Sequence, residues 1–145
     1  MANDQISVMI SSRCNDQFVR SDKRKTLSDV RKALKEEIEN AKLFGHQIFK
    51  VWINEDSPAL SAKNNSWEKC MKQAQDSNIF ICLYNGNAGW GGDKSGLGIC
   101  HAELMTAMNT APGKVRVIEL PMLNKNDKQS EHFAKYYKSI NLFVR

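Results

Sequence analysis

The sequence predicts an α/β protein in which helices cover both faces of a central parallel sheet of about five strands. Two observations lead to this prediction. Short apolar runs rich in β-branched residues alternate along the chain with segments whose apolar residues recur at helical spacing. Right-handed crossovers between parallel strands place the intervening helices on the two faces of the sheet. The length suits one ordinary domain, which we expect to span residues 1–145.

The first strand is predicted at residues 6–10, an apolar run typical of a strand buried on both faces of a sheet. The spacing of apolar residues then changes, and a helix is expected from Thr26 to near Gly45. Thr26 and Asp29 match a capping box at the start of this helix. Its apolar stripe comprises Leu27, Val30, Leu34, Ile38 and Ala41.

The middle of the chain predicts two strands with a helix between them. Residues 47–53 form the second strand, and residues 78–84 are the strongest candidate for a central strand. A short helix lies between these strands, with Asn65 or Ser66 as its cap. The buried stripe of that helix comprises Trp67, Cys70, Met71 and Ala74.

The last part of the chain predicts two further helices and two further strands. One helix follows Gly98 and is ended by Pro112, and a strand is expected at residues 115–120. A helix at residues 131–139 and the beginning of a fifth strand at residues 141–144 complete the chain. Because this fifth strand is barely contained, we expect the sequence to be the N-terminal part of a longer protein.

The composition is typical of a soluble globular protein, with 41% hydrophobic and 26% charged residues. No stretch approaches the roughly 20 apolar residues that cross a bilayer, and the N-terminus lacks the features of a secretory signal. We therefore expect a cytoplasmic protein without a membrane partner. The net charge is +5, but the basic run at residues 20–25 has no aromatic residues that could stack on bases. Nucleic acid is not an expected partner of this domain.

The cysteines show no pattern of a disulfide framework or a metal site. They are irregularly spaced and form no CxxC pair, which favours free structural thiols in a reducing compartment. Cys100 and His101 are adjacent, but consecutive residues of a helix point about 100° apart, so neither a nucleophilic pair nor a metal site is expected there. The four cysteines are Cys14, Cys70, Cys82 and Cys100.

The most unusual segment is the loop at residues 85–98, which holds six of the eight glycines. It joins a predicted central strand to the start of a helix, where unpaired amides and the helix dipole favour an anion such as a diphosphate. The glycine spacing matches neither a P-loop nor a dinucleotide-binding fingerprint, and a mobile surface loop is the alternative. Residues 11–16 follow another strand, so both segments are expected at one edge of the sheet.

Glu103 is the strongest candidate for a catalytic group. It lies one turn into the helix after the glycine-rich loop, between positions that face the core. A carboxylate there could accept hydrogen bonds from ribose hydroxyls and stabilise the oxocarbenium-like charge of a breaking glycosidic bond. The alternative is a glutamate that stabilises its own helix electrostatically.

Two further residues have two interpretations each. Trp90 stands among glycines and either stacks on a base or nicotinamide ring or folds back onto the domain. Arg13 either binds phosphate or forms an ordinary surface pair with Asp16.

Several of these segments together resemble a family of uncharacterised bacterial domains found at the N-terminus of larger proteins, including NLR-like ATPases. That family is related to Toll/interleukin-1 receptor (TIR) domains and to nucleoside 2-deoxyribosyltransferases. The resemblance covers roughly residues 5–120. It rests on Ile10-Ser11-Ser12, on the helix segment at residues 29–34, on the turn from Gly86 to Trp90, and on residues 98–104 with the pair Glu103-Leu104.

The resemblance implies a flavodoxin-like, TIR-like three-layer sandwich in which Glu103 is catalytic. It also implies that Ser11, Ser12 and the loop from Asn85 to Trp90 line a nucleotide pocket. The sequence departs from the family in one respect: a basic insertion separates Asp16 from residues 29–31, and an aspartate replaces the usual glutamate of a Glu-Arg pair. The residues expected to bind substrate are Ser11, Ser12, Arg13, Tyr84, Asn85, Gly86 and Trp90, with Tyr84 or Trp90 packed on a ring.

The function expected from these features is hydrolysis or cyclisation of NAD, with NAD as substrate and no separate cofactor, in bacterial anti-phage defence or signalling. Self-association or fused C-terminal domains are expected partners. Two alternatives stay open. One is a non-enzymatic module that self-assembles or recruits a partner, and the other is a deoxyribosyltransferase-like enzyme acting on free nucleosides.

Overall fold

A computed structural model gives the structure of the chain and describes six segments of it. These segments are residues 5–13, 16–18, 25–56, 63–89, 97–122 and 127–144.

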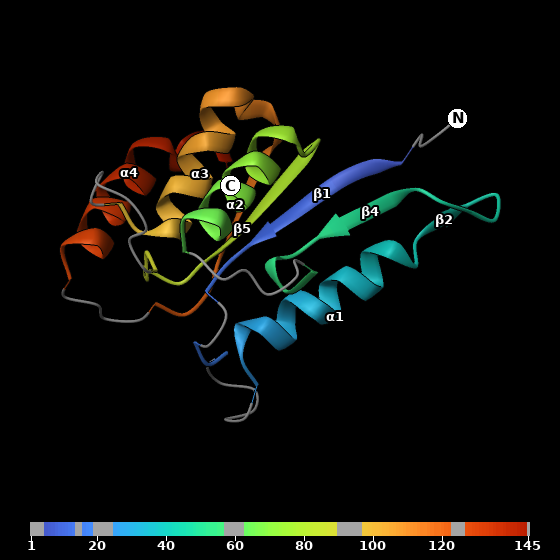
Figure 1. Cartoon of the computed structure of the whole chain (residues 1–145), viewed down its shortest axis with the longest axis horizontal. Coiled ribbons are helices and arrows are strands. Elements are labelled where there is room, and N and C mark those ends of the chain that lie inside the picture. The colour runs from blue at the N-terminus through green and yellow to red at the C-terminus, as the bar shows by residue number, and fades with distance from the viewer. Residues whose placement is uncertain are drawn as a thin grey trace.

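A sheet of four parallel strands forms the centre of the molecule, in the order β4-β1-β5-β6 (Figure 1). Each strand pairs in parallel with its neighbours, and Ser11 at the end of β1 lies beside Cys82 of β5. Helices flank this sheet, consistent with the flavodoxin-like α/β fold that was predicted. The strands are β1 (Ile6–Ser11), β4 (Phe49–Trp52), β5 (Ile79–Tyr84) and β6 (Val115–Glu119).

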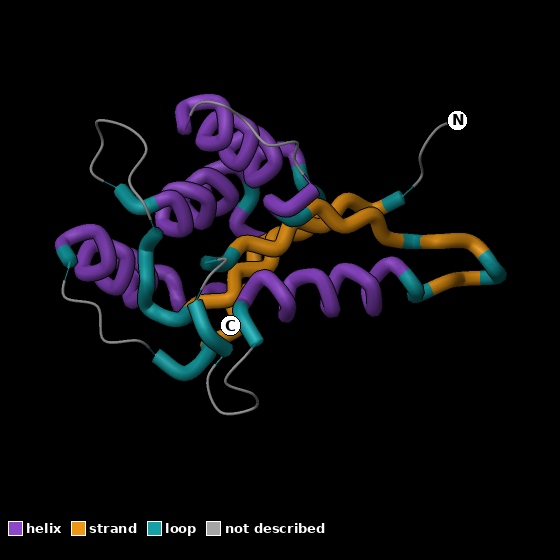
Figure 2. The backbone as a smooth tube through the Cα atoms, turned by 60° about the horizontal axis from the view of Figure 1, so that its bottom comes forward, coloured by secondary structure: helices purple, strands orange, loops and turns teal. Residues whose placement is uncertain are grey.

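Helices cover the sheet unequally (Figure 2). One helix packs on one face, and three pack on the other face. The single helix is α1 (Leu27–Glu39), and the group of three comprises α2 (Lys63–Asp76), α3 (Ile99–Thr110) and α4 (Lys128–Val144). Two short 3₁₀ helices, η1 (Asn54–Asp56) and η2 (Pro112–Lys114), follow β4 and precede β6.

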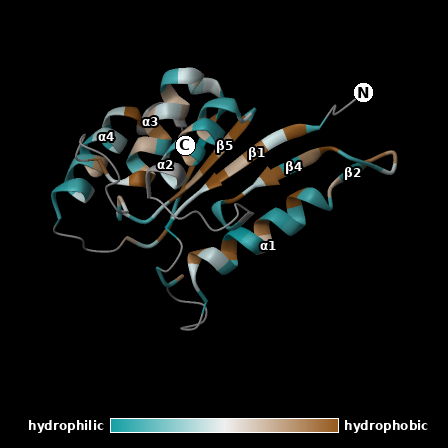
Figure 3. Ribbon diagram, in the orientation of Figure 1, coloured by the Kyte–Doolittle hydropathy of each residue, from teal (hydrophilic) through white to brown (hydrophobic). Residues whose placement is uncertain are grey.

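Two apolar clusters form the core, one on each face of the sheet. Alternation along β1 directs Val8 and Ile10 towards α1 and directs Met9 towards the other three helices. Ser11 has the same parity as Met9, so its side chain points to the face that carries α3. Figure 3 shows apolar residues along the central strands and many polar residues along α1.

The helix predicted from Thr26 to Gly45 begins where expected and ends earlier. Thr26 and Asp29 form the predicted capping box, which satisfies amides at the start of α1. The helix ends at Glu39, and a short antiparallel hairpin follows, with strands β2 (Lys42–Leu43) and β3 (His46–Gln47). The sequence prediction missed this hairpin, which lies at the end of the molecule beyond β4 (Figure 1).

Two other predictions were wrong. Asn65 and Ser66 were expected to cap α2, but both lie inside it because the helix begins at Lys63. The strand expected at residues 141–144 is the last turn of α4, which runs without interruption to Val144. No glycine or proline interrupts the helix after Ser139, and the buried stripe formed by Phe133, Tyr137 and Ile140 recurs at helical spacing. The described part of the main sheet therefore has four strands.

Among the residues that the structure describes, no helix is both long enough and apolar enough to span a membrane.

The hairpin turn provides a test of backbone strain. Phe44 and Gly45 both have positive φ, of 52° and 80°, and Phe44 is 92% exposed, so its ring gains almost nothing from folding. Asparagine tolerates this conformation better than phenylalanine, so Phe44→Asn is expected to raise the free energy of unfolding by about 0.5–1 kcal/mol. Urea denaturation measures the change. Gly45→Ala serves as the opposite case and is expected to destabilise the protein, and a common sign for both variants would contradict the turn assignment.

Candidate functional site

The centre of the site is a buried carboxylate. Glu103 lies in the second turn of α3 and is only 5% exposed. Its Oε1 accepts a hydrogen bond of 2.6 Å from the Oγ of Ser11, which is itself buried at the carboxyl end of β1. The helix is fixed in this orientation because Leu104 and Ala107 pack in the core. The catalytic candidate and one predicted substrate-binding residue therefore meet at the edge of the sheet where α/β proteins bind ligands.

Burial disfavours the ionised form of this carboxylate, whereas nearby hydrogen-bond donors and positive charges favour it. Burial raises the pKa of Glu103 above its ordinary value. The hydrogen bond from Ser11 lowers that pKa in part, as do the positive charge of Arg31, a hydrogen bond from the Cys70 thiol and the charge of Arg13. Thiols also surround the group: burial, and then the negative charge of Glu103, raises the pKa of both Cys82 and Cys100. The carboxylate is therefore held in a dry region with nearby positive charge.

Arg31 of α1 is a second charged group in the interior, with only 2% of its surface exposed. Its Nη1 donates a hydrogen bond of 3.2 Å to the carbonyl of Ser12, and its Nη2 lies 2.7 Å from Oε2 of Glu55 in η1. The same oxygen of Glu55 accepts a hydrogen bond from the Ser28 hydroxyl. One guanidinium thus joins α1, the end of β1 and the segment after β4.

The sequence prediction did not include Arg31 or Glu55 among the site residues, although one signal pointed to Arg31. It lies four residues after Leu27 and three before Leu34, on the buried stripe of the predicted helix. A charged residue at such a position is rarely buried without a partner. The departure noted at position 29 proved separate from the site, because Asp29 caps α1 at its exposed start.

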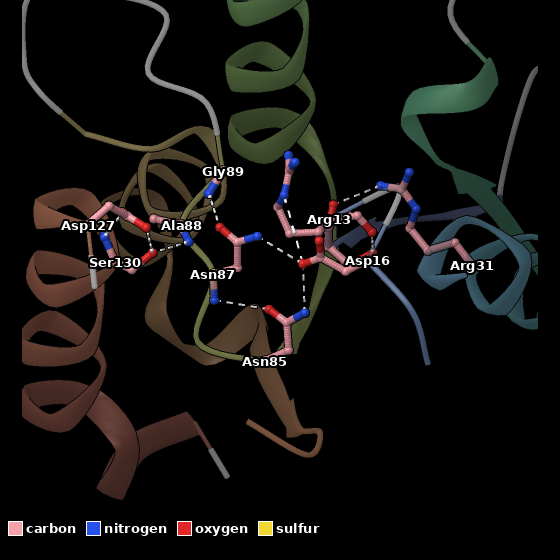
Figure 4. Close-up of polar contacts among 10 residues, drawn as sticks. Arg13, Asp16, Arg31, Asn85, Asn87, Ala88, Gly89, Asp127 and Ser130 are labelled. Carbon is pink, nitrogen blue, oxygen red and sulfur yellow. Dashed lines mark hydrogen bonds and ion pairs between the residues drawn. The ribbon is translucent and has the colours of Figure 1, made fainter. Parts of the chain in front are cut away.

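The loops after β1 and β5 are bound together by Asp16 (Figure 4). Oδ2 of Asp16 accepts hydrogen bonds from the side-chain amides of Asn85, at 2.9 Å, and Asn87, at 3.0 Å. The carbonyl oxygens of these two side chains accept from the backbone amides of Asn87 and Gly89. Arg13 approaches the same carboxylate oxygen at the limit of an ion pair, with Nε 4.0 Å away. The start of the glycine-rich loop is therefore tied to the loop that carries Ser12 and Arg13.

Ala88 connects this loop to two helices. Its carbonyl accepts a hydrogen bond from the amide of Cys100 at the start of α3, and its amide donates to the hydroxyl of Ser130 in α4. Gly98, which precedes α3, packs so closely that an added Cβ would lie 2.3 Å from the oxygen of Ala88. Only glycine fits this contact. Gly89 has a φ of +87° and is similarly confined between Ile99 and Arg13.

The remaining predicted substrate-binding residues occupy different positions. Ser12 is buried, and its hydroxyl donates to the carbonyl of Arg13 at 3.0 Å. Asn85 is buried in the Asp16 network, and Gly86 has a φ of +91°. Tyr84 points away from this group: its ring packs in the core against Phe133 and Tyr137 of α4, with centroid distances of 4.9 and 4.4 Å. Trp90 lies outside the residues that the structure describes.

The structure describes three of the four cysteines, and it describes His101. Cys70, Cys82 and Cys100 are free and buried, as expected for structural thiols, and Cys14 lies outside the described residues. The buried ring of His101 packs on Phe133 and Tyr136 of α4. The described residues contain no group of three or more His, Cys, Asp or Glu side chains placed to hold a metal ion.

Comparison with known proteins gave no relative for this chain: no family model, no curated protein and no solved structure matches it.

The contact between Gly98 and Ala88 predicts a steric effect at one position. Gly98→Ala forces a methyl group into the backbone of Ala88, and we expect a loss of about 1–3 kcal/mol in the free energy of unfolding. Chemical denaturation measures this loss. Gly113→Ala is the matched control, because an added Cβ there meets nothing within 4 Å. Equal effects at the two positions would show that the close contact does not form.

The buried carboxylate predicts a pH-dependent effect on stability. Because folding raises the pKa of Glu103, its contribution to stability is full below the ordinary value of 4.5 and is lost as the pH rises from there through the raised pKa. Glu103→Gln is therefore expected to melt at a higher temperature than the native protein at pH 7. The difference should shrink as the pH falls towards 4.5, and calorimetry across this range measures it. Glu68→Gln, at an exposed position of α2, should show no such trend.

Proposed function

We propose that this chain is a TIR-like N-glycosidase that cleaves the bond between ribose and a cationic base in a nucleotide, with NAD as the leading substrate. The observation that carries the proposal is the buried Glu103 carboxylate, held by Ser11 at the carboxyl end of a central strand. Such a group is costly for folding, and proteins retain costly buried charges mainly at sites where the charge has a use. The same strand edge carries the loops at which α/β proteins bind nucleotides.

The chemistry requires one well-placed negative charge. The bond between C1′ of the ribose and the pyridinium nitrogen breaks, and its electron pair passes to the ring, which leaves as neutral nicotinamide. Positive charge then develops on C1′ and on the ring oxygen of the ribose. Water adds to C1′ and loses a proton, which gives ADP-ribose. The carboxylate of Glu103 stabilises this positive charge and orients the ribose hydroxyls.

Burial strengthens this interaction. In a dry site an ionised carboxylate attracts a developing cation far more strongly than it does in water. The ionised form of Glu103 is needed, and its pKa is raised by burial, so the rate should fall on the acid side at a higher pH than for an exposed glutamate. The position of Arg13 beside Gly89, in the loop before α3, supports a role for its guanidinium in attracting the phosphates of the substrate.

A second glycosidic reaction would use the same carboxylate. Transfer of deoxyribose between free bases also passes through a cationic sugar, and the family resemblance includes nucleoside deoxyribosyltransferases. Such an enzyme needs no phosphate group on its substrate, so Arg13 distinguishes the two reactions. A role in bacterial defence or signalling, with self-association or fused domains, belongs to this proposal through the same resemblance.

The test is a comparison of native protein and Glu103→Gln with NAD and with deoxynucleosides as substrates. Chromatography follows the release of nicotinamide or the exchange of bases, at protein concentrations high enough to allow self-association. We expect the native protein to consume NAD and the variant to lose at least about 100-fold in kcat/KM. Glu68→Gln, which removes the same charge from an exposed position, should keep full activity.

Each outcome decides between functions. Base exchange without loss of NAD would identify a deoxyribosyltransferase. NAD consumption that persists in folded Glu103→Gln would refute the role of this carboxylate. Absence of any turnover by the native protein, up to the concentration at which it self-associates, would favour a module that acts by binding other proteins.

A further inference from the structure

Arg31 makes contacts that its position in an amphipathic helix does not require. A surface helix normally places arginine on its solvent face, yet this side chain is only 3% exposed. It donates to the carbonyl of Ser12, the residue directly after the serine that binds Glu103. Its Nη2 pairs with Oε2 of Glu55, and the same oxygen accepts a hydrogen bond from the Ser28 hydroxyl. Burying this charge is costly, so the arrangement calls for an explanation beyond helix packing.

The geometry suits arginine and not lysine. The guanidinium uses Nη1 for a backbone carbonyl and Nη2 for a carboxylate at the same time, and a lysine ammonium cannot span two such acceptors in fixed planar geometry. Both acceptors lie at the carboxyl ends of neighbouring strands, β1 and β4. Arg31 therefore fixes the backbone from which Ser11 reaches the Glu103 carboxylate.

Glu55 contacts Arg31 through only one of its two carboxylate oxygens. Only Oε2 of Glu55 takes part in the contacts with Arg31 and Ser28, and its Oε1 is buried without a hydrogen-bond partner among the described residues. Arg31 forms an ion pair with Glu55, and its positive charge also lowers the pKa of Glu103. These two carboxylates lie under the influence of one shared cation.

We propose that Arg31 is a positioning residue for Glu103, holding the end of β1 and supplying the interior positive charge that this carboxylate faces, while Glu55 limits that charge. The proposal rests on the proposed function of Glu103 and adds the element that tunes it. Arg31 touches neither substrate nor the reacting bond; it acts through Ser11, Ser12 and the electric field at the carboxylate.

The hydrogen bond from Ser11 lowers the pKa of Glu103 more than Arg31 does, but among the charged groups that lower it Arg31 has the larger effect. Arg13 also lowers the pKa of Glu103, but its effect is smaller than that of Arg31, and its side chain is 24% exposed. The thiols are neutral in the pH range where the carboxylate titrates, since burial raises the pKa of Cys82 and Cys100. The groups around Glu103 are Ser11 from β1, Arg13 from the following loop, Arg31 from α1, Cys70 from α2, Cys82 from β5 and Cys100 from α3 itself.

The proposal predicts that the pKa of Glu103 shifts in opposite directions when Arg31 and when Glu55 is replaced. Arg31→Gln removes the cation and is expected to raise the pKa of Glu103. Glu55→Gln removes a negative charge near that cation and is expected to lower the pKa of Glu103. A purely structural salt bridge would give no such opposition, because breaking it from either end would loosen the same contact.

The experiment measures the pKa of Glu103 directly, by NMR titration of its ¹³C-labelled carboxyl group, assigned by its absence in Glu103→Gln. Arg31→Gln, Arg31→Lys and Glu55→Gln are compared with Arg116→Gln and Glu68→Gln, which change the net charge equally at exposed positions. Circular dichroism selects the variants that remain folded. If NAD is a substrate, the acid limb of kcat/KM should move with the NMR value, and Arg31→Gln should lose about 10- to 100-fold in kcat/KM.

The outcomes separate this proposal from the proposed function. Opposite displacements in the titration without any NAD cleavage would support the role of Arg31 and reject the substrate. Displacements of the same sign, or no larger than those of the two exposed controls, would overturn the role of Arg31 whatever the activity. Arg31→Lys, which keeps the charge but not the two-acceptor geometry, should fall between the native protein and Arg31→Gln in pKa. If Arg31→Gln does not fold, Arg31→Lys and Glu55→Gln still decide the sign.

Discussion

The hydrogen bond between Ser11 and Glu103 is the interaction on which the rest of the site depends. A carboxylate removed from water loses its hydration, and only specific donors and nearby cations make that position tolerable. Ser11 can donate because the alternation of β1 turns it towards α3, while Ile10 turns to the opposite face. The alternation of side chains along β1 therefore decides which face of the sheet carries this hydrogen bond.

The loops around this carboxylate are organised by polar side chains that form hydrogen bonds with each other. Asp16 collects two amides, and the two asparagines that supply them fix the backbone that follows β5. Ala88 then connects this backbone to α3 through the amide of Cys100, and to α4 through the hydroxyl of Ser130 (Figure 4). The segment before Trp90 is thus a defined turn, in which Gly86 and Gly89 both have positive φ, a conformation that glycine adopts most readily.

The sequence predicted features that depend on local patterns. The apolar runs of β1, β5 and β6, the capping box at Thr26 and the start of α3 after Gly98 are encoded within a few residues. The hairpin at Phe44 was missed because phenylalanine is uncommon at a turn position with positive φ, and α4 was cut short because its last turn is as apolar as a strand. Glu103 and Ser11 were predicted, but Arg31, Glu55 and Asp16 act through partners distant in sequence, which no local pattern reveals.

The parallel order of the sheet means that the site is assembled entirely from contacts between distant parts of the chain. Ser11 and Glu103 are separated by 92 positions, and Asp16 is separated from its asparagine partners by 69 and 71. Such contacts form late in folding, since each must first close a long loop of chain. A chain still emerging from the ribosome, or one cut before α3, would hold β1 and α1 yet have no carboxylate beside Ser11. The buried pair of Ser11 and Glu103 thus exists only once folding has joined these two parts of the domain.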